Sequence, residues 1–384
     1  MGHLVRSTEI IRSLVNDFQV CFVNGGQPIA GFQLPSGVEV IHLPAILEVD
    51  GELKAVDSSQ DIESVKQRRT QVLLNAFEQF QPDGLITECF PFSKHKVKFE
   101  LIPLLDRAKA SARPVKVICS LRDLIMTQSR APKVWAKRYD AVCDLINQYY
   151  DLILVHDDPQ LQRLEEFFPN VSRLNCDVYY TGYVAQSPPD APLTVDDQAV
   201  LAQNSPMIVV SVGGGRFGYE LLNAVASASA ILEQTIPHHI YAFTGPFMPD
   251  EQVLQLQQAI AQRKTITIRR YTAHLIDYLN RADLSISLGG YNTTMNILRT
   301  GVRALIYPVA SAEQMGEQTS RATLLAGMGV LDLLQPDDLV GDRLAEKVLA
   351  SLDREPVAHT FDLQGAEKSA LRLKQLLDRS VMVA

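Results

Sequence analysis

The residues with the most chemistry to offer lie in one stretch of the chain, from Ser287 to Gly301. The stretch predicts a strand that ends at Leu288, a hinge at Gly289 and Gly290, and a helix that opens at Thr293. Glycines let the backbone approach a ligand closely, and a helix start offers unpaired N–H groups and a positive dipole end to an anion. The stretch therefore predicts a phosphate site.

Side chains suited to hydroxyl groups accompany this stretch. Asn292 directly precedes the expected helix, and Asn296 lies on its first turns. Glu317 and Gln318 follow the next predicted strand, which ends at Pro308. Recognition of phosphate followed by recognition of sugar hydroxyls is what a nucleotide-sugar site requires.

Further glycine-rich turns join strands to helices in the same half of the chain. Gly213, Gly214 and Gly215 follow the run Met207–Val212, and Gly245 follows the run His239–Phe243. One such loop alone is weak evidence, because many are only tight connections. Their recurrence, together with Thr293 and Thr294, favours phosphate binding.

A histidine and a carboxylate are the candidate catalytic bases. His3 precedes an apolar helical pattern that we expect to begin near Arg6, and a histidine there has the chemistry to deprotonate a hydroxyl group or water. The alternative is a structural role at a chain end. Glu88 ends the predicted strand Gly84–Glu88, where carboxyl ends of strands face a ligand in α/β proteins.

Two other polar clusters have competing interpretations. Arg122 and Asp123 follow the run Val115–Leu121, and a place in the cleft and a local ion pair are equally open. The sequence from His156 through Asp158 is compatible with metal ligands, but Asp before Pro159 is more typical of a helix cap. We therefore expect no metal site.

Composition narrows the class of protein. The chain has 384 residues, 46% hydrophobic and 21% charged, with a net charge of -8 and no dense run of Lys or Arg, which disfavours a nucleic-acid binder. The five cysteines form no C-x-x-C pair. Because no apolar run is long enough to span a bilayer and no signal-peptide pattern is seen, we expect a cytoplasmic protein with reduced thiols.

Strand and helix patterns alternate through two halves of the chain. The pattern predicts two doubly wound α/β domains, 1–187 and 188–384, joined at the proline-rich segment 186–192. Two patterns, 160–168 and 363–378, predict helices, whereas the segment 45–60 reads as a long loop.

Six motifs, in order along the chain, resemble those of GT-B glycosyltransferases. The resemblance is to the family 28-like branch that contains the lipid II N-acetylglucosaminyltransferase, and within it to a group of predicted bacterial glycosyltransferases. The motifs are Gly2–Ser7 (G-H-x-x-R-S), Thr87–Phe92 (T-E-x-F-P-F), Cys119–Asp123 (C-S-L-R-D), Thr181–Val184 (T-G-Y-V), Gly290–Thr293 (G-Y-N-T) and Glu317–Ala322 (E-Q-x-x-R-A).

This resemblance implies a GT-B fold, with two Rossmann-like domains facing each other across a cleft, and metal-independent chemistry with no cofactor beyond the nucleotide-sugar substrate. It places His3 as the base for the acceptor hydroxyl. It implies donor contacts from Gly213-Gly214-Gly215 at the diphosphate, Tyr271 and Thr272 at the nucleobase, Thr293 and Thr294 at the phosphates, and Glu317 and Gln318 at the sugar hydroxyls.

Two departures from the resemblance stand out. Asn296 occupies the position of a ribose-reading glutamate, which loses a charge-assisted bond. The relatives also have a buried first strand before the glycine-histidine motif, whereas this chain has Met1 at that point. Either translation begins upstream or the first domain lacks a central strand.

Three functions remain open from the sequence. The leading one is an inverting glycosyltransferase that moves a sugar from a nucleotide-diphosphate sugar, with uridine as the expected base. The others are a nucleotide-sugar hydrolase of the same fold and a catalytically silent binding subunit. The acceptor, whether a small molecule, a lipid-linked intermediate or a glycan, is undetermined, and contact with a membrane surface stays open.

Overall fold

The computed structural model describes residues 2–29, 32–49, 51–122, 132–189, 191–308, 315–355, 357 and 360–378. The chain divides into two compact α/β units, Val184–Leu363 and Ser7–Tyr183. The first turn of helix α1 (Gly2–Leu14) is grouped with the former unit, and helix α13 (Gly365–Leu377) with the latter.

The unit Val184–Leu363 is built on a six-stranded parallel sheet of order β11-β10-β9-β12-β13-β14. Its central strands read as continuous apolar or small-residue runs because helices cover both faces of the sheet. The strands are β9 (Met207–Ser211), β10 (His239–Phe243), β11 (Ile266–Arg269), β12 (Leu284–Leu288), β13 (Arg303–Tyr307) and β14 (Asp332–Leu333).

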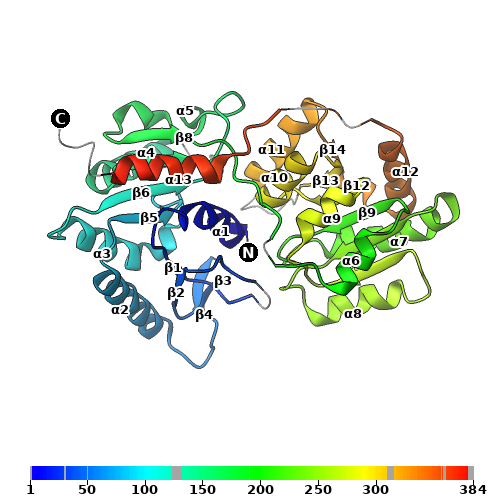
Figure 1. The fold of residues 1–384 in the computed structure, drawn as a ribbon, viewed down its shortest axis with the longest axis horizontal. Helices are drawn as coiled ribbons and strands as arrows, with labels where there is room; N and C mark the ends of the chain where they lie inside the picture. The colour runs from blue at the N-terminus through cyan, green and yellow to red at the C-terminus, as the bar shows by residue number, and fades with distance from the viewer. Residues whose placement is uncertain are drawn as a thin grey trace. The chain divides into compact units, whose positions relative to one another are not determined.

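Alternate residues of β9 enter two separate cores of this unit. Ile208 and Val210 pack with α7, α8 and α12, whereas Met207 and Val209 pack with α6, α9, α10 and α11. Figure 1 shows α7 and α12 side by side, in agreement with their direct packing. The helices are α6 (Val195–Leu201), α7 (Tyr219–Thr235), α8 (Asp250–Ala259), α9 (Leu275–Arg281), α10 (Tyr291–Thr300), α11 (Met315–Gly327) and α12 (Gly341–Leu352).

The unit Ser7–Tyr183 contains its parallel strands in two separate sheets. One sheet has the order β5-β6-β7-β8 and the other pairs β1 with β2, while β3 and β4 form a hairpin. The strands are β1 (Cys21–Asn24), β2 (Glu39–His42), β3 (Ile46–Val49), β4 (Glu52–Ala55), β5 (Gly84–Glu88), β6 (Lys116–Leu121), β7 (Leu152–Val155) and β8 (Asp177–Tyr180). Among the described residues, no strand joins β1 to β5.

Helices cover the four-stranded sheet of this unit on both sides. Val117 and Cys119 of β6 face a core that also receives α2 (Ile62–Phe80), α3 (Lys98–Lys109) and α4 (Pro132–Tyr149). Helix α13 is tied to the unit by Arg372–Asp177 (2.7 Å) and Lys374–Asp17 ion pairs. Figure 1 shows α13, in red, beside the strands of this unit.

The structure differs from the sequence predictions at several elements. The segment 45–60 contains the β3–β4 hairpin instead of a plain loop. The helix expected over 160–168 shrinks to α5 (Leu164–Phe167), because Asp158 accepts the Gln160 N–H and closes a turn first. The predicted terminal helix is present as α13, but it packs with Ser7–Tyr183 instead of with the second half of the chain.

Candidate donor and catalytic site

Helix α10 begins directly after the buried strand β12, at the predicted hinge. Gly290 is its N-cap and provides no side-chain cap, so the first-turn N–H groups keep their capacity for an anion. The helix starts at Tyr291, two residues earlier than expected. Thr294 donates its hydroxyl to the Gly290 carbonyl oxygen at 3.1 Å, which stabilises the turn.

Arg321 of α11 contacts both the hinge and the first residue of α10. Its guanidinium donates to the Gly289 carbonyl oxygen at 3.0 Å and lies over the ring of Tyr291, 5.5 Å from the ring centre. Arg321 is the arginine of the E-Q-x-x-R-A motif, but the sequence alone indicated no role for it. The signal was an arginine one helical turn after Gln318, and such a residue on α11 lies on the same side as its neighbour at i−3.

The two glycine loops after β9 and β10 lie against each other, backbone on backbone. A Cβ on Gly215 would stand 2.3 Å from the Thr244 carbonyl oxygen, and one on Gly245 would stand 2.4 Å from the Gly213 carbonyl oxygen. Both glycines also have positive φ angles, 84° and 81°. Glycine is therefore required here by the loop-to-loop contact itself.

The other predicted donor residues have definite surroundings. Thr272 accepts the His274 N–H at 3.0 Å just after β11, and burial raises the pKa of the Tyr271 hydroxyl. Gln318 lies against the hinge, 3.6 Å from a Cβ built on Gly289. The side chain of Glu317 lies outside the described residues. Asn292 donates to the carbonyl oxygen of Gly2 at 2.8 Å.

Asn296 is only 1% exposed and its amide is already engaged. Its Nδ2 donates to Gln186 Oε1 at 2.7 Å, and its Oδ1 accepts the Gln186 N–H at 3.4 Å. The pair holds the segment that follows Val184 against α10. To hydrogen-bond a ribose hydroxyl, as the sequence suggested, Asn296 would first have to release Gln186.

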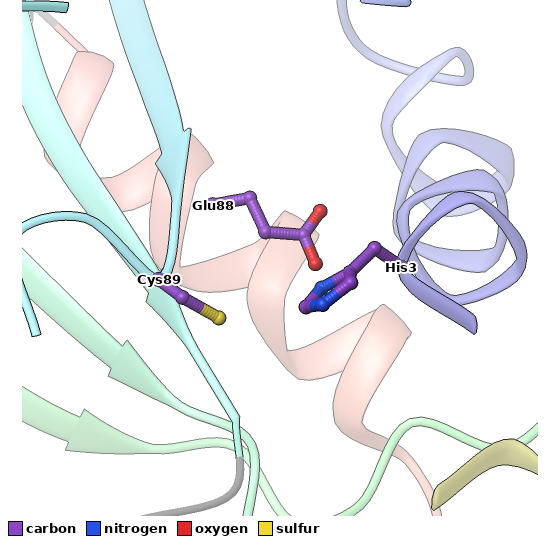
Figure 2. Close-up of side chains that lie close together, drawn as sticks. All are labelled: His3, Glu88 and Cys89. Atoms are coloured by element: carbon purple, nitrogen blue, oxygen red, sulfur yellow. The ribbon is translucent and has the colours of Figure 1, made fainter. Parts of the chain in front are cut away.

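Helix α1 carries the candidate base His3. The expected start near Arg6 would have placed His3 before the helix. The helix is instead continuous from Gly2, and His3 lies in its first turn. One turn later on the same face, Ser7 donates its hydroxyl to Glu88 Oε2 at 2.6 Å. Figure 2 shows the His3 ring beside the Glu88 carboxylate, at the end of β5.

Cys89 completes this cluster. Possible ligand atoms of His3, Glu88 and Cys89 all lie within 4.8 Å of one another. Cys89 is 3% exposed and has φ 57°, a left-handed conformation that is costly for a residue with a side chain. Imidazole, carboxylate and thiolate are ligands that zinc accepts, so the donor types suit a metal although the sequence predicted none.

A chain of hydroxyl and imidazole groups runs beneath the same sheet edge. His156 is fully buried, with Ser120 Oγ 2.8 Å from Nε2 and Thr181 Oγ1 2.9 Å from Nδ1. Both ring nitrogens are engaged, and Asp158 caps a turn.

Arg122 is half-buried immediately after β6, whereas Asp123 lies outside the described residues. The cleft and ion-pair interpretations of this pair both stay predictions. Within the described part of the chain, no helix combines the length and apolarity needed to cross a membrane.

Parts of the chain are similar in sequence to known glycosyltransferases. Residues 208–376 match the model of the glycosyltransferase family 28 C-terminal domain. The chain is 31% identical over 124 residues to the NDP-glycosyltransferase YjiC of Bacillus subtilis, covering 30% of each chain. It is also 31% identical over 100 residues to the UDP-N-acetylglucosamine–N-acetylmuramyl-(pentapeptide) pyrophosphoryl-undecaprenol N-acetylglucosamine transferase of Streptococcus pneumoniae, covering 26% of this chain and 27% of the relative. These alignments span under a third of either relative's length.

Solved structures match over almost the whole chain. Spinosyn forosaminyltransferase superposes with a TM-score of 0.61 at 14% identity, covering 98% of this chain and 96% of the other. MurG of Acinetobacter baumannii gives a TM-score of 0.51 at 14% identity with the same coverage. The chain therefore has the GT-B fold, with a second half that resembles family 28 glycosyltransferases.

Proposed function

We propose that the protein is an inverting glycosyltransferase that uses a nucleotide-diphosphate sugar, with uridine as the base. The proposal rests on the uncapped start of α10, which follows β12, and on the two contacting glycine loops, which follow β9 and β10 of the same sheet. All three follow adjacent parallel strands, and ligands of such sheets bind at the carboxyl ends of the strands. Names of relatives that act on NDP and UDP sugars support the choice of donor.

The donor diphosphate would accept hydrogen bonds from the N–H groups in the first turn of α10, and the helix dipole would offset the negative charge of the diphosphate. As the bond between the anomeric carbon and the diphosphate oxygen breaks, that charge grows on the leaving group. Fixed N–H donors stabilise it without reorganising, which lowers the barrier. Arg321 contributes by holding the Gly289 carbonyl and Tyr291 in place.

His3 is our choice for the general base. In this scheme the acceptor hydroxyl attacks the anomeric carbon from the face opposite the leaving diphosphate, and its proton passes to the imidazole. The sugar configuration inverts, and the nucleoside diphosphate leaves with the bonding electrons. Glu88, held by Ser7, would orient the ring and stabilise its protonated form.

We propose that this chemistry needs no metal, since the helix start and N–H groups can neutralise the diphosphate. The His3, Glu88 and Cys89 donors would then serve proton transfer and not metal binding. Gln318 and Glu317 are proposed to contact sugar hydroxyls, and Tyr271 and Thr272 the base. The acceptor class, small-molecule or lipid-linked, is left to experiment.

The test joins a binding assay to a turnover assay. We expect UDP to bind the wild-type chain in isothermal titration, and His3→Ala to lower UDP release from UDP-sugars by about 10²- to 10⁴-fold with little change in UDP affinity. His42→Ala on strand β2 is the matched control, because His42 is exposed and its loss should leave both unchanged.

Three results would contradict the proposal in different ways. No binding of any nucleoside diphosphate at millimolar concentration would remove the donor site. Release of free sugar in the absence of acceptor, unchanged by acceptors, would make the protein a hydrolase. Unaltered turnover in His3→Ala would remove His3 and leave Glu88 as the base.

A further inference from the structure

Arg216 differs from the other arginines of the unit Val184–Leu363. It is exposed in the loop 212–218, between β9 and α7, and no described residue forms a hydrogen bond or an ion pair with it. Each of the other arginines that the structure describes in this unit donates to at least one protein oxygen. The N–H donors of Arg216 therefore keep their capacity for a ligand.

The guanidinium of Arg216 is nevertheless held in place, by an aromatic ring. Its central carbon lies 5.6 Å from the centre of the Phe247 ring, and Phe247 itself is half-buried. A cation at this distance is attracted to the face of a ring, and the contact uses none of the N–H groups. The charge is thus positioned without being neutralised.

Phe247 is in turn fixed by the two glycine loops. Its N–H donates to the Gly214 carbonyl oxygen at 2.9 Å. The neighbouring Gly215 and Gly245 pack the two loops backbone on backbone. Arg216 and the ring that holds it therefore belong to one tightly packed pair of loops, and a charge held in this way needs little reorganisation when a ligand binds.

The loop that carries Arg216 lies beside the start of α10. Strand β9, which leads into the loop, is paired with β12, and neighbouring strands are about 4.8 Å apart. At the other end of the loop, a Cβ on Gly218 would stand 3.0 Å from Leu288 Cδ1. Leu288 is the last residue of β12, and Gly289 and Gly290 lead from it into α10. An anion at the first turn of α10 would therefore lie next to the loop that carries Arg216.

The start of α10 alone supplies too little positive charge for a diphosphate. A helix dipole is equivalent to roughly half an elementary charge at the N-terminus, whereas each phosphate in a diester linkage carries about one negative charge. The loop 212–218 contains no acidic residue, so Arg216 gives it a full positive charge. A guanidinium stays charged at neutral pH, and its planar fork matches the oxygens of a phosphate. Residue type, charge and position all suit a phosphate ligand.

We propose that Arg216 binds the diphosphate of the nucleotide-sugar donor and acts in place of a divalent metal, with Phe247 as its positioning residue. This inference rests on the proposed function, because it takes the donor to be a nucleotide-diphosphate sugar. When the bond between the anomeric carbon and the diphosphate oxygen breaks, the bonding electrons stay on that oxygen. The guanidinium stabilises the added negative charge and keeps its own protons throughout.

The first experiment separates binding of phosphate from binding of nucleoside. UDP binding is measured by titration calorimetry and uridine binding by NMR titration. We expect Arg216→Gln to weaken UDP binding by about ten- to hundredfold, as for loss of a charge-assisted hydrogen bond, and to leave uridine binding within about twofold. Arg263→Gln is the matched control. Arg263 pairs with Glu233 and precedes β11, at the amino end of the strands, so its loss should change neither affinity.

A turnover assay tests the charge in the transition state and the role of Phe247. We expect Arg216→Gln to lower kcat for UDP release by about 10²- to 10³-fold, the range for loss of one donor to a developing oxyanion. Phe247→Leu should lower kcat by less, and Phe247→Tyr, which keeps the ring face, should retain the wild-type kcat. Because Phe247 acts through Arg216, the double variant Arg216→Gln/Phe247→Leu should be no slower than Arg216→Gln alone.

The outcomes separate this inference from the proposed function. If the wild type binds no nucleoside diphosphate, the donor site and the role of Arg216 are both refuted. If the wild type binds UDP and Arg216→Gln, shown to be folded by circular dichroism, binds it as tightly, only the role of Arg216 is refuted. Equal losses for UDP and uridine would mean that Arg216 shapes the loop and does not bind phosphate. Additive losses in the double variant would remove Phe247 as the positioning residue.

Discussion

Replacing Gly215 by alanine tests whether the interlocked loops build the donor site. The new Cβ would lie 2.3 Å from the Thr244 carbonyl oxygen and 3.0 Å from the Met248 nitrogen, both backbone atoms. Real Cβ contacts stay beyond 3.0 Å, so the two loops must separate by about 0.7 Å. A left-handed φ of 84° adds about 1–2 kcal/mol for a residue with a side chain.

The expected result combines a stability loss with a binding loss. We expect the free energy of unfolding in urea to fall by about 2–4 kcal/mol, since strain and overpacking act together. A shift of this size in loops that we propose contact the diphosphate should weaken UDP binding at least about tenfold, because pre-organised N–H donors tolerate little displacement. Titration calorimetry at a temperature where the variant is folded measures the second effect.

Gly301→Ala is the matched control. Gly301 has a similar φ of 67°, but a Cβ there meets no atom within 4 Å. This variant should lose only the conformational part, about 1–2 kcal/mol, and bind UDP as the wild type does. If folded Gly215→Ala binds UDP within twofold of the wild type, the two loops do not shape the donor site and the reasoning fails.

The remaining predictions concern the sugar, the metal and the scaffold. Gln318→Ala should reduce turnover while UDP affinity stays within a few-fold, and equal losses would refute separate roles. Turnover should survive removal of divalent ions by EDTA, and loss with rescue by zinc would instead assign the His3 cluster to a metal. Burial raises the pKa of Asp197, but hydrogen bonds from Tyr278 and Thr194 and the charge of Arg269 lower it by more, so the pKa of this carboxyl lies below its ordinary value. The stability that this carboxylate contributes is therefore present above its unfolded pKa and lost as pH falls through the folded one. In urea unfolding, Asp197→Asn should cost about 3 kcal/mol at neutral pH and progressively less below about pH 4, and a pH-independent cost would contradict this.

The sequence predicted local features of the site better than the contacts between distant residues. The order of β12, hinge and α10 follows from short-range pattern, because apolar runs, glycines and helix periodicity are local properties. Two predicted helix starts were wrong for the same reason. Helix α10 begins at Tyr291 instead of Thr293, and α1 begins at Gly2 instead of near Arg6. Helix ends depend on which backbone groups find partners, and composition gives only a weak signal for that.

Contacts across long separations were not predictable from pattern. Ser7 and Glu88 are 81 residues apart, and Asn292 and Gly2 are 290 apart. The sequence singled out Glu88, but nothing local indicates that Ser7 would hold it. In the same way, Asn296 looked like a ligand-reading amide, whereas the fold brings Gln186 to it.

The return of α13 to the unit Ser7–Tyr183 has a practical consequence for protein engineering. A cut at the linker near 187 would separate this unit from the helix that Arg372 and Lys374 fasten to it, and Leu377 would no longer pack beside Gly84. Chimeras that exchange halves between related enzymes should therefore cross over twice, near 183 and again near 364. A single-crossover chimera would combine the unit Ser7–Tyr183 of one parent with the C-terminal helix of the other, and its solubility would report on that mismatch before any assay of activity.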